Sequence, residues 1–176
     1  WMLKWAGHDA VAVLDGGLQA WQAGGGAVAS GAEPARFQSN FELRPPLRQL
    51  ASAADVLAAL QQPGQTLIDA RGAPRYRGEV EPLDPVAGHI PGALNRPFGD
   101  NIGADGRFKP ADVLRAEFEA LLAGRNASTV VHQCGSGVSA LPNMLAMELA
   151  GLSGSKLYPG SWSEWCADPS RPVVTG

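Results

Sequence analysis

The sequence predicts an α/β domain with a mostly parallel central sheet, and three observations support this fold class. Short β-rich runs, residues 65–70 (QTLIDA) and 128–133 (STVVHQ), are bounded by polar and turn-forming residues, as buried strands are. Helix-like segments alternate with these runs, which is typical of a parallel sheet. The chain has 176 residues, 45% of them hydrophobic and 18% charged, which suits one good core with appendages.

Local signals place the elements of this domain in order. The predicted elements are a helix over 52–60, a strand over 65–70, a helix over 110–123, a strand over 128–133 and a helix over 139–150. Ser52 and Asp55 have the spacing of a capping pair, and Pro110 suits the start of a helix. Because ligands bind beyond the carboxyl ends of strands in such sheets, Asp69 and Cys134 mark the expected site.

The two ends of the chain resemble each other. Residues 3–21 (LKWAGHDAVAVLDGGLQAW) align without gaps on residues 147–165 (MELAGLSGSKLYPGSWSEW). Both copies predict a helix that ends at a glycine, a short strand (11–14 and 156–158) and a glycine turn that opens a helix with a tryptophan. The spacing fits tandem domains, and two unrelated helix–strand–helix segments are the alternative interpretation.

This repeat predicts three parts of the chain: residues 1–24 as the C-terminal fragment of a first domain, residues 25–48 as a linker, and residues 49–176 as a complete catalytic domain. The linker is rich in glycine, alanine and proline and shows little periodicity. Within it, Phe37 and Phe41 are expected to pack against a domain surface. The rest of the first domain is therefore an expected partner of this chain.

Charge and composition exclude several classes of function. A formal net charge of −3 gives no reason to expect nucleic acid or an acidic membrane as a partner. No run approaches the roughly 18–20 apolar residues of a membrane span, and no signal peptide is visible. The only cysteines, Cys134 and Cys166, form neither a disulfide framework nor a metal site. We therefore expect a reducing compartment, the cytoplasm, and no metal or other cofactor.

The loop after the second strand is the strongest chemical signal in the sequence. Cys134 is followed by Gly135, Ser136, Gly137, Val138 and Ser139. Glycines let successive backbone N–H groups turn inward into an anion-binding nest, and the helix expected from Ser139 directs its positive end there. Such surroundings favour the nucleophilic thiolate over the thiol. A small buried cysteine at a tight turn is the alternative.

Other cysteine chemistries fit this loop less well. A cysteine phosphatase or an arsenate reductase would carry an arginine at the sixth position after the cysteine to grip the oxyanion, and that position is Ala140. A papain-like hydrolase needs a histidine base. His132 points to the same face of its strand as Cys134, but a histidine packed in the strand is the better interpretation.

Four segments together resemble the rhodanese family of sulfurtransferases in its tandem-domain form. They are DARGAPRYRGEVEP (69–82), GHIPGALN (88–95), CGSGVSA (134–140) and LYPGSWSEW (157–165). The resemblance implies a rhodanese-like fold, with helices on both faces of the sheet. It also implies that Cys134 accepts a sulfane sulfur as a persulfide and passes it to a thiol or to cyanide. A persulfide- or oxyanion-binding module without turnover is the alternative, and modules of that kind lack the reactive cysteine.

The resemblance also suggests the sulfur donor, 3-mercaptopyruvate or thiosulfate. The loop resembles that of the 3-mercaptopyruvate enzymes, whereas thiosulfate-specific enzymes more often carry Arg-Lys after the cysteine. Arg75 falls where the mercaptopyruvate members keep one carboxylate-binding arginine. Their second arginine is absent from EVEPLDP (79–85), and Arg77 is a candidate substitute.

Further residues near the loop have expected roles, and the resemblance supplies that of Ser136. Ser136 matches a loop serine that takes part in proton handling, and Gly135, Gly137, Val138 and Ser139 would contact the substrate. Asp69 and Arg71 either form a structural ion pair that supports the loop or act directly. His89 is expected to hold a loop by hydrogen bonding, and Cys166 is expected to be inert.

Overall fold

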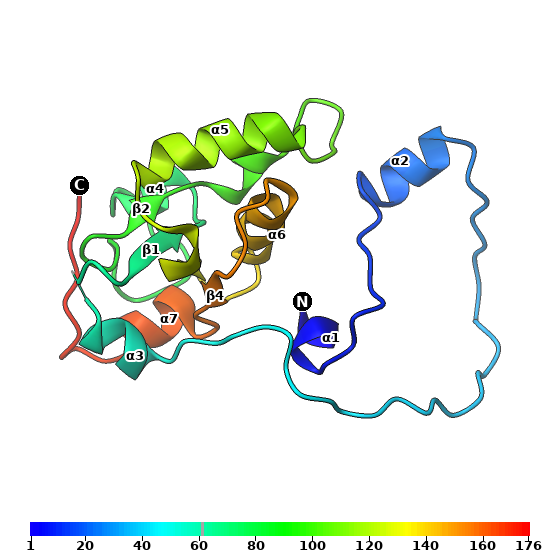
Figure 1. Cartoon of the computed structure of the whole chain (residues 1–176), viewed down its shortest axis with the longest axis horizontal. Helices are drawn as coiled ribbons and strands as arrows, with labels where there is room; N and C mark the ends of the chain where they lie inside the picture. Colours follow the sequence, from blue (N-terminus) through cyan, green and yellow to red (C-terminus); the bar gives the residue numbers. More distant parts are fainter. Residues whose placement is uncertain (61) are drawn as a thin grey trace.

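The computed structural model describes residues 1–60 and 62–176, and it contains an α/β domain with an N-terminal arm, residues 1–48 (Figure 1). The helices are α1 (Met2–Trp5), α2 (Gly17–Ala23), α3 (Ala53–Ala58), α4 (Ala73–Tyr76), η1 (Phe98–Asn101), α5 (Ala111–Leu122), η2 (Ala127–Thr129), α6 (Leu141–Leu149) and α7 (Ser161–Cys166). The strands are β1 (Thr66–Asp69), β2 (Leu94–Asn95), β3 (Val130–Gln133) and β4 (Lys156–Leu157). No helix in these two ranges is long and apolar enough to cross a membrane.

The four strands form one sheet in the order β2-β1-β3-β4, and every pair is parallel. The predicted fold class is therefore confirmed. The two longer strands were predicted from the sequence, and β1 and β3 lie side by side at the centre, with Ile68 opposite His132. Because β1 and β3 are parallel neighbours, their carboxyl ends meet at one edge, which places Asp69 beside Gln133 and brings Cys134 next to them.

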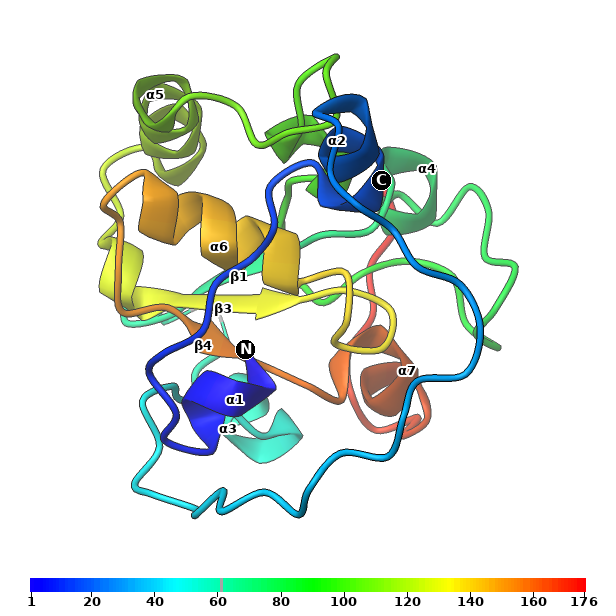
Figure 2. The same ribbon diagram turned by 90° about the vertical axis from the view of Figure 1, so that its right-hand side faces the viewer.

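Helices cover both faces of this sheet (Figure 2). On one face Ile68 and Val130 pack with apolar residues of α5 and α6, including Phe118. On the other face Leu67 and Val131 pack with α3 and α7, whose large side chains include Trp162 and Trp165. Successive strand residues point to opposite faces, so β1 and β3 each supply an apolar residue to both cores.

The expected caps and helix boundaries agree closely with the structure. Ser52 accepts a hydrogen bond from the N–H of Asp55, whose carboxylate accepts one in return from the N–H of Ser52, so the capping box is complete. The helix that this box begins ends at Ala58, two residues before the predicted end. Pro110 is the N-cap of α5. Differences of one or two residues at helix ends are ordinary.

The predicted strand over residues 11–14 is absent, and this expectation was wrong. Val13 is 65% exposed, and among the described residues this segment pairs with no strand. A β-strand forms only where a neighbouring strand pairs with its backbone groups, and residues 11–14 have no such neighbour among the described residues. Its counterpart near the C-terminus does pair with β3, as β4.

The packing of the linker was also partly mispredicted. Phe37 is fully exposed, and the chain around it runs away from the domain (Figure 1). Phe41 does find a partner, because its ring lies 5.8 Å from the ring of His8. The residues around Phe37 are small or polar, so this stretch offers little apolar area to hold it against a surface.

The two copies of the repeat share backbone details. Gly7 and Gly151 end their helices with φ of +81° and +73°, and in each copy the next N–H bonds to the carbonyl five residues earlier at 2.8 Å. At the start of the second helix, Gly17 and Ser161 occupy matching positions with φ of +61° and +52°. These shared turns support one supersecondary unit used twice.

Candidate active site

Cys134 lies directly after β3, and its backbone is held from both sides. Its N–H donates to Oγ of Ser161 at 3.1 Å, and its carbonyl accepts from the N–H of Trp162 at 3.0 Å. The residue is 2% exposed, and its side chain belongs to a small apolar cluster with Ala70, Ala140, Met144 and Leu157. The start of α7 therefore holds the backbone of Cys134 in place at the end of β3.

The loop after Cys134 presents a row of free backbone donors. No N–H group of residues 135–140 donates a hydrogen bond to any residue that the structure describes. Gly137 has φ of +82°, and a Cβ atom there would lie 2.4 Å from the carbonyl oxygen of Pro159, so only glycine fits. Free donors of this kind form an anion-binding concavity.

Helix α6 begins at Leu141 rather than at the predicted Ser139, because the turn around Gly137 continues for two further residues and Pro142 lies in the first helical turn. Its N-terminal end still follows the free donors directly. The partial positive charge of the helix end therefore adds to the field of the loop.

Ser161 is a residue that the sequence reasoning missed. Its hydroxyl accepts from the N–H of Cys134 and donates to the carbonyl of Tyr158 at 2.9 Å, and the residue is fully buried. Its backbone has φ of +52°, which residues other than glycine rarely adopt. The repeat offers a signal in hindsight, since the matching position in the first copy is Gly17, where that backbone costs little.

Replacing Ser161 should reveal both of its roles. Ser161→Ala should lower the free energy of unfolding by about 1–3 kcal/mol, because the buried N–H of Cys134 loses its acceptor while the strained backbone remains. Ser161→Gly loses the same acceptor but relaxes the backbone, so its loss should be smaller. Urea unfolding of both variants checks this order, and equal losses would contradict the role of the strained backbone.

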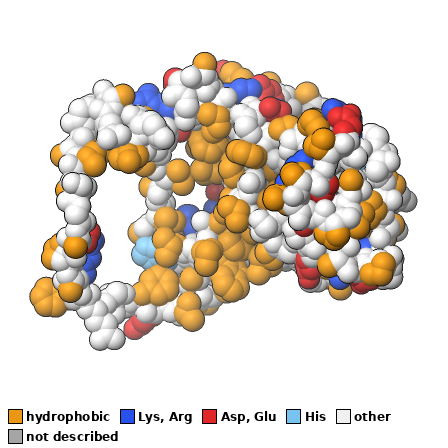
Figure 3. Space-filling view, turned by 180° about the vertical axis from the view of Figure 1, so that it is seen from behind, with side chains coloured by type: hydrophobic (Ala, Val, Ile, Leu, Met, Phe, Trp, Pro, Cys, Tyr) orange, Lys and Arg blue, Asp and Glu red, His pale blue; other side chains and the backbone are white. Residues whose placement is uncertain are grey.

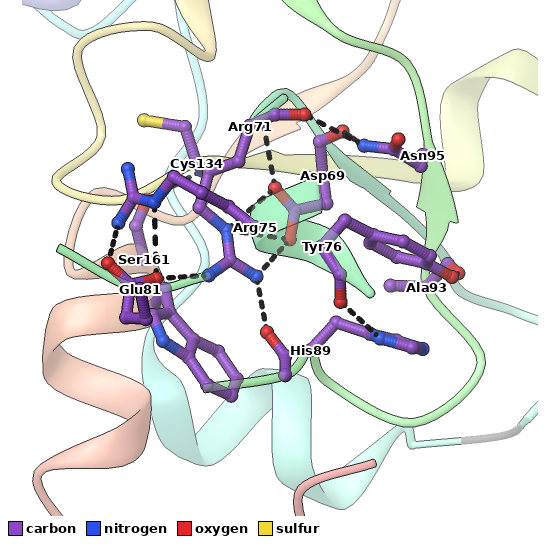
Figure 4. A network of polar contacts seen from close by, with 12 residues as sticks. Asp69, Arg71, Arg75, Tyr76, Glu81, His89, Ala93, Asn95, Cys134 and Ser161 are labelled. Carbon is purple, nitrogen blue, oxygen red and sulfur yellow. Dashed lines mark hydrogen bonds and ion pairs between the residues drawn. The ribbon is translucent and has the colours of Figure 1, made fainter. Parts of the chain in front are cut away.

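Arg75 approaches the cysteine loop from α4 (Figure 4). Its Nε and Nη2 donate to the two carboxylate oxygens of Glu81, and Nη2 also lies 3.3 Å from Oδ2 of Asp84. Its Nη1 faces the loop, since a Cβ atom on Gly135 would lie 3.5 Å from it. Nη1 donates no hydrogen bond to a described residue, so it remains available to an anion at the loop.

Asp69 and Arg71 form a buried ion pair beneath the loop. Nη2 of Arg71 donates to Oδ2 of Asp69 and to the carbonyl of Gly88, both at 2.7 Å. The guanidinium also contacts Glu81 and lies 4.6 Å above the ring of Trp162. With every guanidinium nitrogen of Arg71 engaged, this geometry favours the supporting role over direct contact with a substrate.

Glu81, a second residue that the sequence reasoning did not single out, joins the two arginines. Burial works against its charge, but hydrogen bonds from Arg75 and from two backbone N–H groups outweigh burial and hold the pKa of Glu81 below its usual value. Its side chain is 3% exposed. The carboxylate is therefore ionised at neutral pH and orients Arg75 toward the loop.

Two of the proposed site residues make no contact that ties them to the thiol. Arg77 pairs with Glu79 at 2.6 Å on the surface, and no hydrogen bond in the described chain links it to the cysteine loop. Ser136 lies at the exposed rim of the loop, where its hydroxyl makes no hydrogen bond with a described residue.

Three further titratable residues, His89, His132 and Cys166, are buried. Nδ1 of His89 lies 2.8 Å from the carbonyl of Tyr76, and the two rings stack. His132 is fully buried, and burial lowers its pKa to about 3, so it is neutral. Burial, with a contribution from Asp84, raises the pKa of Cys166, which keeps that thiol protonated.

A parallel α/β sheet, with a cysteine at the tip of a central strand and a loop of free N–H donors after it, defines a class of α/β domains with a cysteine at the carboxyl edge of the sheet. The chain belongs to the family of rhodanese-like domains, whose family model matches residues 52–168.

Among known proteins, the chain is 52% identical over 177 residues to a Pseudomonas aeruginosa protein named "Probable 3-mercaptopyruvate sulfurtransferase", with 100% of this chain and 62% of that protein aligned. It is 36% identical over 179 residues to the 3-mercaptopyruvate sulfurtransferase of Escherichia coli, covering 98% of this chain and 61% of that protein. The chain thus spans about three fifths of the length of these relatives.

A solved structure extends the likeness to three dimensions. The anaerobic ergothioneine biosynthesis enzyme of Chlorobium limicola, in complex with trimethyl histidine, matches with a TM-score of 0.86 and 27% identity. The match covers 99% of this chain and 44% of that one, so it includes the N-terminal arm as well as the domain.

Proposed function

We propose that this protein is a sulfurtransferase in which Cys134 is the nucleophile. It would move a sulfane sulfur from 3-mercaptopyruvate or thiosulfate, through a persulfide on Cys134, to a thiol or to cyanide. The observation that carries the proposal is the row of free N–H donors over residues 135–140, which directly follows a cysteine at the end of a central strand. The names of the aligned relatives support the same reaction.

The chemistry requires a thiolate and a stabilised leaving group. With 3-mercaptopyruvate, the Cys134 thiolate attacks the donor sulfur, an S–S bond forms and the C–S bond breaks. The electron pair of the C–S bond stays on the carbon, so the enolate of pyruvate leaves and takes up a proton. A persulfide remains on Cys134. An acceptor thiolate then attacks the outer sulfur and restores the Cys134 thiolate, which completes a ping-pong cycle. With thiosulfate, sulfite is the leaving group.

The residues around the loop would have different roles in this reaction. The free N–H donors bind the anionic part of the donor and stabilise the charge that develops on the leaving group. Nη1 of Arg75 is in reach of a donor carboxylate at the loop. Ser136 supplies an exposed hydroxyl for proton transfer, and Asp69 and Arg71 keep the loop in place. Arg77 would need to leave Glu79 to take part.

Two alternatives fit the site less well. A binding module without turnover would not need a nucleophile, whereas this loop is built around Cys134. A cysteine phosphatase or arsenate reductase would need an arginine where Ala140 is fully buried.

We also propose that the N-terminal arm packs against the rest of a first domain. Its helices expose apolar side chains, and hydrophobic atoms gather on the arm and on the face of the domain beside it (Figure 3). Trp1 packs against the Cys134 cluster, and Asp15 accepts from the N–H of Phe108 at 2.9 Å. The first domain would therefore border the active site.

Two free thiols are consistent with a reducing compartment such as the cytoplasm.

Exposure to a sulfur donor followed by mass spectrometry tests the proposed function. One extra sulfur atom should appear on the peptide that contains Cys134 and should disappear after a thiol acceptor is added. The peptide that contains Cys166 provides an internal control, because burial keeps that thiol protonated. Absence of the added sulfur with both donors would rule out the proposed reaction.

A further inference from the structure

Asp84 places a carboxylate beside the arginine that faces the cysteine loop. Its Oδ2 lies 3.3 Å from Nη2 of Arg75, and its side chain is 10% exposed. The position is set by Glu81, whose Oε1 accepts from the backbone N–H groups of Leu83 and Asp84 at 3.1 and 3.3 Å. This turn folds the carboxylate of Asp84 back toward the guanidinium.

The two carboxylates on Arg75 are not equivalent. Glu81 is almost fully buried and receives two hydrogen bonds from the guanidinium, so it is a permanent partner. Asp84 makes one longer contact and is more exposed. Asp84 therefore contributes negative charge beside the guanidinium but only one long contact to it.

The charges of this group do not balance. Arg71 and Arg75 together face three carboxylates, those of Asp69, Glu81 and Asp84, which leaves one negative charge in excess. An anion that approaches Nη1 of Arg75 therefore meets an arginine whose charge is already neutralised. Glu81 is needed to orient Arg75, whereas the contact of Asp84 only weakens the field that Arg75 offers to the loop.

We propose that Asp84 is a specificity-determining residue that weakens the hold of Arg75 on the carboxylate of the sulfur donor. The inference rests on the proposed function. It assigns to this site donors that carry a carboxylate within reach of Nη1 of Arg75, in addition to the N–H donors of the loop. Such donors should bind more weakly here than at an arginine free of a second acidic partner.

The decisive variant is Asp84→Asn, which keeps the shape of the side chain and removes its charge. We expect kcat/KM for 3-mercaptopyruvate to rise about three- to tenfold, mostly through KM, since one unit charge within roughly 8 Å is removed from a partly screened site. Thiosulfate carries its charge on the group bonded directly to the transferred sulfur, where the loop N–H donors rather than Nη1 would hold it. Its kcat/KM should therefore change by less than half as much on a logarithmic scale. Glu119→Gln, an exposed residue on α5, makes the same change in net charge and should alter neither donor.

A double-mutant cycle separates this role from a structural one. In an Arg75→Ala background, Asp84→Asn should no longer raise kcat/KM, because the carboxylate acts through Arg75. A fall in kcat/KM with both donors would show that Asp84 is needed to hold Arg75, and an equal rise with both would show a general charge effect. Either result would overturn the inference while leaving the sulfurtransferase proposal intact, provided that the unmodified protein forms the Cys134 persulfide. Absence of that persulfide overturns both.

Discussion

Replacing Cys134 by serine should abolish sulfur transfer with every donor, with a loss in kcat on the order of 10³ or more. A hydroxyl at this position is a weak nucleophile and cannot hold a persulfide. The fold should persist, because the backbone of residue 134 is held by Ser161 and Trp162 whatever side chain it carries. A buried hydroxyl without a partner should cost about 1–2 kcal/mol. Steady-state assays with 3-mercaptopyruvate and thiosulfate measure the loss.

Cys166→Ser is the matched control for this experiment. Cys166 is buried on α7, and its Sγ lies 3.9 Å from the carbonyl of Ser163, so the hydroxyl of a serine can find an acceptor there. Turnover should remain near that of the unmodified protein. If this variant lost activity and Cys134→Ser kept it, the assignment of the nucleophile would be reversed.

The second large effect is expected at Arg75. Arg75→Met should lower kcat/KM for 3-mercaptopyruvate about ten- to a hundredfold, because a charge-assisted contact worth roughly 1.5–3 kcal/mol is lost. The loss with thiosulfate should be smaller, since the anionic group of that donor is bonded directly to the transferred sulfur, where the loop N–H donors rather than Nη1 would hold it. Equal losses with both donors would show that Arg75 is structural.

Arg75 also holds Glu81, so stability must be separated from binding. Removing the guanidinium leaves the buried carboxylate of Glu81 with the contact from Arg71 at 3.3 Å and the N–H groups of Leu83 and Asp84. The free energy of unfolding should therefore fall by less than the ~3–5 kcal/mol of a fully broken buried pair. The double variant Arg75→Met/Glu81→Gln removes the unpaired charge and should recover part of this stability. It should not recover the selectivity for 3-mercaptopyruvate, which needs the guanidinium.

The site was predictable to the extent that it depends on residues close together in sequence. The glycines around Cys134 and the strand before it lie within one short segment, and the free N–H groups follow from that segment. The capping box at Ser52 is likewise a signal over three residues. Asp69 and Cys134 could be placed at one edge because parallel strands share their carboxyl ends.

By itself, the sequence determined the fold class and pointed to the proposed nucleophile and the loop that follows it, because strand patterns, helix caps and glycine turns are local properties of the chain. Only the tertiary structure decided how Arg75 is used and what holds the thiol. Ser161 reaches Cys134 across 27 residues, and the turn that follows Glu81 brings Asp84 onto Arg75. The strand expected at 11–14 failed for the same physical reason, since the formation of a strand depends on a neighbour that local sequence does not specify.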